Sequence, residues 1–263
     1  MGCGRGGAAL ITLTTDFGLV DPFVGILKGV IASRAPGVAT IDITHGIPPQ
    51  DVLAGALVLR HAVPFFPPRT VHLAVVDPGV GSTRRALCVE TDTAMLVGPD
   101  NGLFSLVAPA PAVRRIVELT EERFFLTPRS ATFHGRDVFA PVAAAVATGT
   151  NLDDLGPRRP ELQRLTVPEP TRHPSAVHGQ VIYVDRFGNL VTNLPGRTFP
   201  PDRVSISIGR ARIRGVSPSY AAVARDTPVA VVNSWDLLEI AVRDGSACER
   251  FGAGVGEPVI VET

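Results

Sequence analysis

Short apolar runs alternate with helix-like apolar spacings along the first half of the chain. The runs are too short for helices and end in polar residues, which is typical of buried strands. Between the runs, apolar residues recur every three to four positions, which predicts helices, the second of them capped by Asp51. Strands that alternate with helices predict βαβ units and a mostly parallel central sheet. The expected strands cover residues 9–13, 38–43 and 70–76, and the expected helices cover residues 23–33 and 52–62.

The pattern changes after the third strand. Residues 86–91 and 93–98 are two apolar runs joined by a short turn, which predicts a hairpin. Residues 137–147 are rich in Ala and Val and predict a buried helix. A charged stretch with many prolines follows at 157–174, and this composition is typical of a linker or an extended segment.

Beyond this stretch the chain consists of short apolar runs separated by Gly, Pro and Asp turns. The runs between residues 178 and 262 predict an all-β fold, a small barrel or a sandwich. We therefore expect an α/β N-terminal domain at 1–165, which includes the start of the linker. A barrel-like C-terminal β domain is expected at 166–263.

Composition and charge exclude several classes of protein. The chain has 263 residues with 25 basic and 25 acidic side chains, so its formal net charge is zero. It lacks the excess positive charge that drives binding to nucleic acid, and no run of about 18 apolar residues indicates a membrane span. Cys3, Cys88 and Cys248 are widely spaced, which argues against a disulfide framework and a structural zinc site. No secretory signal is recognisable, so we expect a cytoplasmic protein.

Residues that follow the predicted strands are candidates for a site, because parallel α/β sheets bind ligands beyond the carboxyl ends of their strands. Asp16 follows the first strand, where a carboxylate can accept hydrogen bonds from a ribose diol. Asp21, later in the same loop, is better interpreted as the N-cap of the next helix. His45 follows the second strand and is interpreted as a satisfied turn histidine.

The densest group of polar residues follows the third strand. Asp77 stands at the strand end, a loop of Gly and Pro comes next, and Arg84 and Arg85 close the segment. The glycines match neither a Walker motif nor GxGxxG, so phosphate binding is weakly supported, and an Asp–Arg ion pair that stabilises the loop is the alternative. His134 precedes the buried helix, where it can act as an acid, a base or a hydrogen-bond donor.

In the C-terminal domain, Asp185, Phe187 and Asn189 share one loop between two strands. The loop is either an ordinary hairpin turn or an adenine pocket in which the ring stacks and the amide reads a polar edge. Glu239 falls among apolar residues, and a half-buried carboxylate needs a partner, which favours a binding role. No side chains have metal-ligand spacing and no nucleophile elbow occurs, so we expect neither a metal nor covalent catalysis.

Six motifs in order resemble one family over nearly the whole chain. They are TTDFGLVDPFVG, VVDPGVGSTRR, GPDNGL, TFHGRDVFAP, DRFGNLVTN and NSWDLLEIAV. The family is the S-adenosyl-L-methionine (SAM) hydroxide adenosyltransferases, SAM hydrolases that form adenosine and are related to the bacterial fluorinase and chlorinase. The resemblance implies an α/β domain followed by a barrel-like domain. It also implies SAM as the substrate, no cofactor, and a homotrimer with ligands at its subunit interfaces.

The resemblance implies a reaction and the residues for it. Water displaces methionine from C5′ of the ribose, and the family's Asp–Arg–His set matches Asp77, Arg84 and His134, with Arg85 as the alternative arginine. Asp77 and His134 would position and polarise the water, while Arg84 would hold the Asp77 carboxylate. The implied substrate-binding residues are Asp16, Asp77, Phe133, Asp185, Phe187, Asn189, Ser234, Glu239 and Val242.

Departures from the halogenases favour water as the nucleophile. The halogenases have tyrosines where this chain has Asp77 and His134, and fluorinase has a serine at the position of Gly135 and an inserted loop near residues 91–93. A charged Asp77 would repel a halide, and Gly135 lacks the donor hydroxyl. Trp235 replaces an arginine that holds the methionine carboxylate in fluorinase, so the ligand of that carboxylate stays open.

Three functions are therefore compared. SAM hydrolysis to adenosine and L-methionine is favoured, because Asp77, Arg84 and His134 occur together in their motifs. The presence of Asp77 and His134 at the two tyrosine positions of the halogenases argues against a halide-dependent synthase of 5′-halo-adenosine. A sensor that binds adenosine or SAM without turnover would have no need of the Asp–Arg–His set.

Overall fold

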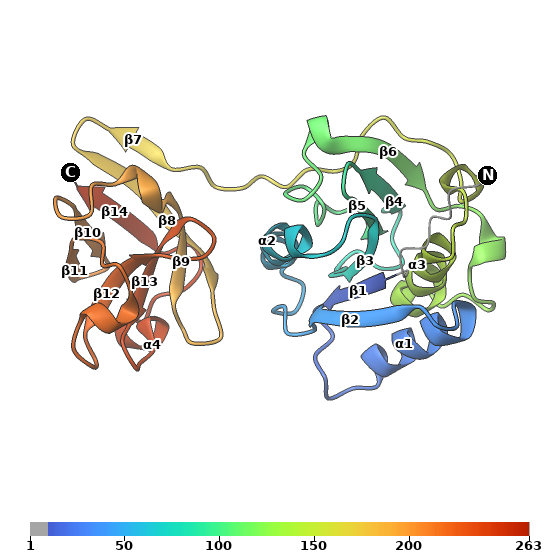
Figure 1. Cartoon of the computed structure of the whole chain (residues 1–263), viewed down its shortest axis with the longest axis horizontal. Coiled ribbons are helices and arrows are strands. Elements are labelled where there is room, and N and C mark those ends of the chain that lie inside the picture. The colour runs from blue at the N-terminus through green and yellow to red at the C-terminus, as the bar shows by residue number, and fades with distance from the viewer. Residues whose placement is uncertain (1–9, 263) are drawn as a thin grey trace, which may run out of the picture. The chain divides into compact units, whose positions relative to one another are not determined.

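The computed structural model describes residues 10–262, and the chain divides into two compact units between Leu165 and Thr166 (Figure 1). Each unit has its own sheet and its own hydrophobic core. Cys88 and Cys248 are free thiols, and Cys3 lies outside the described residues. No helix among residues 10–262 is long and apolar enough to cross a membrane.

The N-terminal unit contains a six-stranded sheet in the order β2-β1-β3-β5-β4-β6. Strand β4 runs antiparallel to both of its neighbours, and the other neighbouring pairs are parallel, which confirms the mostly parallel sheet. The charged strand β6 was missed by the sequence pattern. The strands are β1 (Leu10–Thr15), β2 (Ala39–Thr44), β3 (Thr70–Val75), β4 (Ala86–Thr91), β5 (Ala94–Pro99) and β6 (Val113–Glu118).

The helices of this unit begin for different local reasons. Asp51 caps α2 (Val52–Ala62) by accepting a hydrogen bond from the Ala54 N–H at 2.9 Å, as predicted. The prediction that Asp21 caps α1 (Phe23–Arg34) is wrong, because the N-cap is Pro22 and no side chain bonds to the helix end. The proline ring fixes φ at −73°, and the Pro22 carbonyl accepts the Ile26 N–H at 2.9 Å, so the first turn starts from the backbone without a capping side chain.

The third helix starts earlier than the sequence predicts. A π-helical turn, η4 (Gly135–Phe139), leads directly into α3 (Ala140–Ala147). Pro141 has no N–H to donate to the Asp137 carbonyl, and that carbonyl instead accepts the Leu126 N–H at 2.8 Å. This bond ties the loop before His134 to the start of the helix.

The C-terminal unit is an eight-stranded antiparallel sheet in the order β11-β10-β14-β8-β9-β13-β12, with β7 paired to β8. Ser217, which follows β11, bridges to Val231 of β12, so the ends of the sheet nearly meet and the unit is barrel-like, as predicted. The short helix α4 (Ala247–Phe251) begins at Ser246, whose side chain caps it. The strands are β7 (Thr171–His173), β8 (Ala176–Val184), β9 (Leu190–Pro195), β10 (Ser205–Ile208), β11 (Ala211–Arg214), β12 (Pro228–Val232), β13 (Leu237–Val242) and β14 (Pro258–Glu262).

Burial along the strands explains why the hydrophobic pattern differs between the two halves of the sequence. All six residues of β3 are buried, as expected for a central parallel strand that is covered on both faces. In β10, Ile206 and Ile208 are buried while Ser205 and Ser207 are partly exposed, because one face of this strand meets the barrel core. Continuous apolar runs in the first unit and alternation in the second follow from this difference.

Candidate functional site

The carboxyl edge of the parallel sheet carries two of the predicted carboxylates. Asp16 follows β1 and Asp77 comes two residues after β3, and the two strands pair through Thr15 and Val75. The Asp16 side chain accepts a hydrogen bond from the backbone N–H of Gln50 at 2.8 Å through Oδ2. Topology therefore brings both aspartates to one edge of the sheet, where ligands of α/β proteins bind.

Asp77, Arg84 and His134 form a connected network at this edge. The Arg84 Nε lies 3.0 Å and 3.1 Å from the two Asp77 carboxylate oxygens, and its Nη2 lies 2.5 Å from Oδ2. The same Nη2 lies 2.9 Å from Nδ1 of His134. The Asp77 and Arg84 side chains are 5% and 10% exposed, so solvent screens their ion pair only weakly. Arg84 thus joins the carboxylate and the imidazole in one hydrogen-bonded network.

The neighbouring Arg85 has different partners. Its Nη2 lies 2.6 Å from Oδ2 of Asp100 and 3.3 Å from the carbonyl oxygen of Glu161. The buried Asp100 also accepts the backbone N–H of Gln163 at 2.7 Å. The Arg85–Asp100 pair therefore anchors the start of the linker to the N-terminal unit. Of the two candidate arginines, Arg84 is the one that contacts Asp77.

The contact with Arg84 determines which nitrogen of His134 carries the proton. A guanidinium donates and does not accept, so Nδ1 is the acceptor and Nε2 bears the hydrogen of the neutral ring. Burial lowers the pKa of His134, and the charges of Arg84 and Arg129 lower it further. The carboxylates of Asp77 and Asp137 oppose this shift without reversing it. His134 is therefore a neutral N–H donor at pH 7.

Phe133 belongs to an aromatic cluster beside this network. Its ring packs edge to face on Phe17 and on Phe23, with centroid distances of 6.0 Å and 5.3 Å. Gly135 permits this packing, because a Cβ there would lie 3.3 Å from the Phe17 ring and 3.4 Å from the Phe133 ring. A side chain at position 135 would push against the rings that flank His134.

In the C-terminal unit, Asp185 organises the loop that contains Phe187 and Asn189. Its Oδ1 accepts the backbone N–H groups of both residues at 2.8 Å and 2.9 Å, and its Oδ2 accepts the Asn189 side-chain amide at 2.9 Å. Gly188 has a φ of +78°, and a Cβ there would strike the Ser246 hydroxyl at 2.1 Å. Phe187 is 75% exposed, so its side chain is accessible to a ligand.

A pocket of about 410 Å³ opens in the C-terminal unit, and Asp185, Ser234 and Glu239 all line it. Glu239 is 3% exposed, and its carboxylate accepts the Tyr220 hydroxyl at 2.6 Å and the Asn233 amide at 3.0 Å. The fold therefore brings three of the predicted binding residues into one cavity.

The sequence analysis missed the two tyrosines of this pocket, Tyr183 and Tyr220. The chain has one tryptophan and two tyrosines, and all three line the cavity. The Trp235 and Tyr183 rings lie 5.3 Å apart between centroids, and Tyr220 bonds to Glu239. The rarity of Trp and Tyr in this chain is a sequence signal that could have drawn attention to these residues. The sequence has no pattern, however, that places the three positions together.

Three other predicted residues do not line this pocket. The Asn189 amide holds Asp185, and Phe187 lies in the same loop. Val242 is buried at the end of β13, where its carbonyl accepts the Gly245 N–H at 3.1 Å. Their roles toward a ligand stay predictions.

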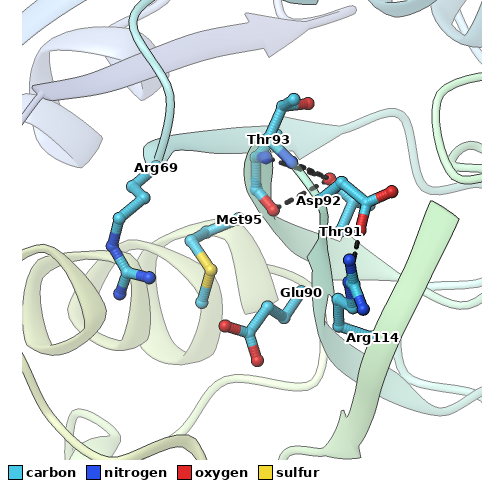
Figure 2. Close-up of a pocket in the computed structure, with 8 residues that line it drawn as sticks. Arg69, Glu90, Thr91, Asp92, Thr93, Met95 and Arg114 are labelled. Carbon is cyan, nitrogen blue, oxygen red and sulfur yellow. Dashed lines mark hydrogen bonds and ion pairs between the residues drawn. The ribbon is translucent and has the colours of Figure 1, made fainter.

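A pocket of about 340 Å³ lies at the opposite edge of the N-terminal sheet, where β3 and β5 begin. Figure 2 shows Arg69 on one side of it and the ion pair of Arg114 with Asp92 on the other. The turn between β4 and β5 is tight, and the Thr91 hydroxyl accepts the Ala94 N–H at 2.9 Å. This is the region where fluorinase was expected to carry an insertion, and it lies away from the edge that holds Asp77. Among residues 10–262, no group of three or more His, Cys, Asp or Glu is placed to hold a metal.

The chain combines an α/β unit with a polar carboxyl edge and a barrel-like unit with an acidic and aromatic pocket. Concave pockets with a few converging polar groups are typical of proteins that bind small molecules. The chain belongs to the SAM hydroxide adenosyltransferase family. Residues 11–156 match the model of the family's N-terminal domain, and residues 179–260 match the model of its C-terminal domain.

Similar proteins cover almost the whole chain. The (R)-S-adenosyl-L-methionine hydrolase of Salinispora tropica is 42% identical over 250 residues, which are 94% of this chain and 95% of the relative. A Thermus thermophilus protein of the same name is 42% identical over 93% of this chain and 96% of the relative. An uncharacterized conserved protein from Thermotoga maritima has a similar crystal structure, with a TM-score of 0.90 and 35% identity over 96% of this chain and 100% of that chain. An Actinoplanes fluorinase is more distant, at 26% identity over 72% of each chain.

Proposed function

We propose that the chain hydrolyses SAM to adenosine and L-methionine. The observation that carries this proposal is the network of Asp77, Arg84 and His134 at the carboxyl edge of the sheet. Membership of the family and relatives named (R)-S-adenosyl-L-methionine hydrolase support the same reaction. A halide-dependent synthase has less support, because the fluorinase relative is far less similar.

In the proposed reaction, a water oxygen forms a bond to C5′ of the ribose while the C5′–S bond breaks. The electron pair of the broken bond goes to sulfur, and methionine leaves as a neutral thioether. The proton that water loses passes to Asp77 and then to solvent. Since the sulfonium is already a good leaving group, the protein needs mainly to hold the water in line with the C–S bond.

Asp77 and His134 would hold this water from two sides. The Asp77 carboxylate accepts a hydrogen from the water, and the Nε2–H of His134 donates to the water oxygen. A second lone pair of that oxygen then faces C5′, and Asp77 takes the proton as the new bond forms. Arg84 holds both side chains in place because its guanidinium contacts the Asp77 carboxylate and the His134 ring.

The predicted binding residues divide between the two units. For the ribose diol we propose Asp16, and for the adenosine ring Phe133, Phe187, Asn189 and the backbone at Val242. For the methionine part we propose Asp185, Ser234 and Glu239, which share one pocket. We further propose a homotrimer, in which the N-terminal unit of one copy and the C-terminal unit of the next complete each site. A cytoplasmic location and the absence of a cofactor are part of the same proposal.

Purified protein incubated with SAM is expected to release adenosine and methionine in equal amounts. Chromatography of the products in halide-free and in chloride buffer distinguishes the three functions. A hydrolase forms adenosine in both buffers, whereas a halide-dependent synthase forms 5′-chloro-5′-deoxyadenosine in chloride. A sensor binds SAM and leaves it intact. Failure to form adenosine in either buffer would refute the proposal.

Activity is expected to fall at acidic pH. Because the pKa of His134 is lowered from its ordinary value of 6.5, the ring stays neutral at pH 7 and gains a proton only below pH 6.5. Protonation places a hydrogen on Nδ1, which breaks the contact with Arg84 and sets two cations side by side. We therefore expect kcat/KM to be level between about pH 7 and 8 and to decline below pH 6.5.

The His134→Asn variant is the matched control for this pH dependence. The asparagine amide can accept from Arg84 and donate to water but does not titrate over this range. Its kcat/KM is expected to be reduced at neutral pH and to lack the decline that the wild type shows below pH 6.5. An unchanged acid limb in the variant would assign the titration to another group.

A further inference from the structure

The pocket of the C-terminal unit has a one-sided charge balance. Asp185 and Glu239 line it, and none of its lining residues, all of which lie in the described part of the chain, is Lys, Arg or His. The two oxygens of Glu239 accept from the Tyr220 hydroxyl and the Asn233 amide, which are neutral donors. The Asp185 carboxylate accepts only from N–H groups of its own loop, as far as the structure describes it. Both negative charges are thus satisfied in hydrogen bonds but are not neutralised.

The charge of both carboxylates reaches across the cavity. The pKa of Tyr220 is raised, first by burial, then by its hydrogen bond to Glu239, and also by the negative charges of Glu239 and Asp185. Glu239 is 3% exposed, so water screens its charge poorly. A ligand in this cavity therefore experiences a negative potential.

Three aromatic residues contribute to the remaining wall. Tyr183 and Trp235 lie 5.3 Å apart between ring centroids, at an interplanar angle of 42°, and Tyr220 lines the same cavity. Ring faces attract ammonium and sulfonium groups through their quadrupoles, and the attraction grows when the site is desolvated. Carboxylates and aromatic rings together are the chemistry that recognises an organic cation.

A carboxylate would find no matching charge in the same cavity. A substrate carboxylate there would meet two like charges, and the Ser234 side chain can offer it a hydrogen bond but no positive charge. The pocket is therefore suited to one end of an amino acid, the ammonium, and not to the other.

We propose that this pocket recognises the ammonium group of the substrate without requiring its carboxylate, so the chain also hydrolyses adenosyl sulfoniums whose side chain is an alkylamine. The proposal rests on the proposed hydrolase function. The test compound of this class is decarboxylated SAM, in which the sulfur carries an aminopropyl chain. Water forms a bond to C5′, the C5′–S bond breaks with its electrons going to sulfur, and 3-(methylthio)propylamine leaves. The proton from water passes to Asp77 and then to solvent.

The first experiment compares three substrates on the full chain. The values of kcat/KM for SAM and for decarboxylated SAM are expected to agree within about threefold, because the carboxylate contributes little. The third substrate, 5′-dimethylsulfonio-5′-deoxyadenosine, has neither ammonium nor carboxylate. Its kcat/KM is expected to be lower by about tenfold or more, since the contacts of the ammonium with rings and carboxylates are lost. A loss of more than about thirtyfold on decarboxylated SAM would overturn the proposal, because it would require a cation that pairs with the carboxylate.

Two variants at Trp235 test whether this pocket sets the preference between SAM and decarboxylated SAM. Trp235→Arg brings a cation to the wall and is expected to shift the preference toward SAM over decarboxylated SAM by about tenfold. Trp235→Phe keeps a ring and is expected to leave the ratio of the two substrates unchanged, which makes it the matched control. Circular dichroism of both variants shows whether the barrel is intact.

A binding measurement separates this proposal from the proposed hydrolase function. If SAM itself is not hydrolysed, the hydrolase function fails, and calorimetry with SAM and decarboxylated SAM still tests the pocket. Equal affinities within about threefold would support recognition of the ammonium alone, and much weaker binding of decarboxylated SAM would refute it.

Discussion

Replacing Asp77 with asparagine is expected to lower kcat for adenosine release by about a thousandfold, with a small change in KM for SAM. In the proposed reaction the carboxylate both positions the attacking water and accepts its proton, and general-base contributions of this kind are worth about 10²–10⁴ in rate. Asparagine keeps the size of the side chain but offers one acceptor oxygen and cannot take the proton. Of the two contacts from the Arg84 Nε to the carboxylate oxygens, one is lost because the amide nitrogen does not accept, and the other weakens because its acceptor is no longer charged. Steady-state kinetics with chromatographic detection of adenosine measures the effect.

The matched control for Asp77→Asn is Asp92→Asn. Asp92 also pairs with an arginine, Arg114, but it lies in the pocket at the opposite edge of the same sheet (Figure 2). Its kcat is expected to stay within about twofold of the wild type, since exposed ion pairs contribute little to stability. If the two variants lost activity to the same extent, Asp77 would have no special part in the reaction.

The second large effect is expected at Arg84. Arg84→Lys should lower kcat about a hundredfold, because an ammonium is a point donor and cannot serve both Asp77 and His134 as the guanidinium does. Lysine keeps the positive charge, so the pKa of His134 and the acid limb of the pH profile should move little. The loss would therefore come from positioning, because a misplacement of about 1 Å can cost a hundredfold in rate.

Arg84→Met separates the charge of this residue from its geometry. Removing the guanidinium removes one of the charges that lower the pKa of His134, so that pKa rises and the acid limb moves to higher pH. The variant is expected to lose at least as much activity as Arg84→Lys, and to show the shift that the lysine variant lacks. Arg114→Met, at the opposite edge of the sheet, is the control and should change neither quantity. Equal pH profiles in all three variants would argue against the contact between Arg84 and His134.

Much of the fold could be predicted because its signals are local. The buried run of β3, the alternation in β10 and the capping side chain of Asp51 are each visible within a few residues of sequence. The prediction failed where local preference was weak. Strand β6 carries the charged residues Arg114 and Arg115, and Arg115 is accommodated because it pairs with Glu90 of the neighbouring strand.

The candidate site could be predicted only as a set of residues. Strand ends and motifs pointed to Asp77, Arg84 and His134, but the sequence left Arg84 and Arg85 as alternatives, since adjacent residues share every local feature. The structure shows that Arg84 contacts Asp77 and that Arg85 contacts Asp100, fifteen residues further along the chain. Which arginine meets which carboxylate depends on the course of the loop, and that is a property of the packed fold.

By itself the sequence determined the two-domain architecture, the family resemblance and the strand ends at which the candidate site residues lie, because hydrophobic periodicity and turn residues act over short distances. Only the tertiary structure decided which side chains meet. It joined Tyr183, Tyr220 and Trp235 with Glu239 in one cavity, although they lie on separate segments of the barrel. It also set the tautomer of His134 through Arg84, fifty residues away. Contacts of this kind arise when distant segments pack together, and no local pattern encodes them.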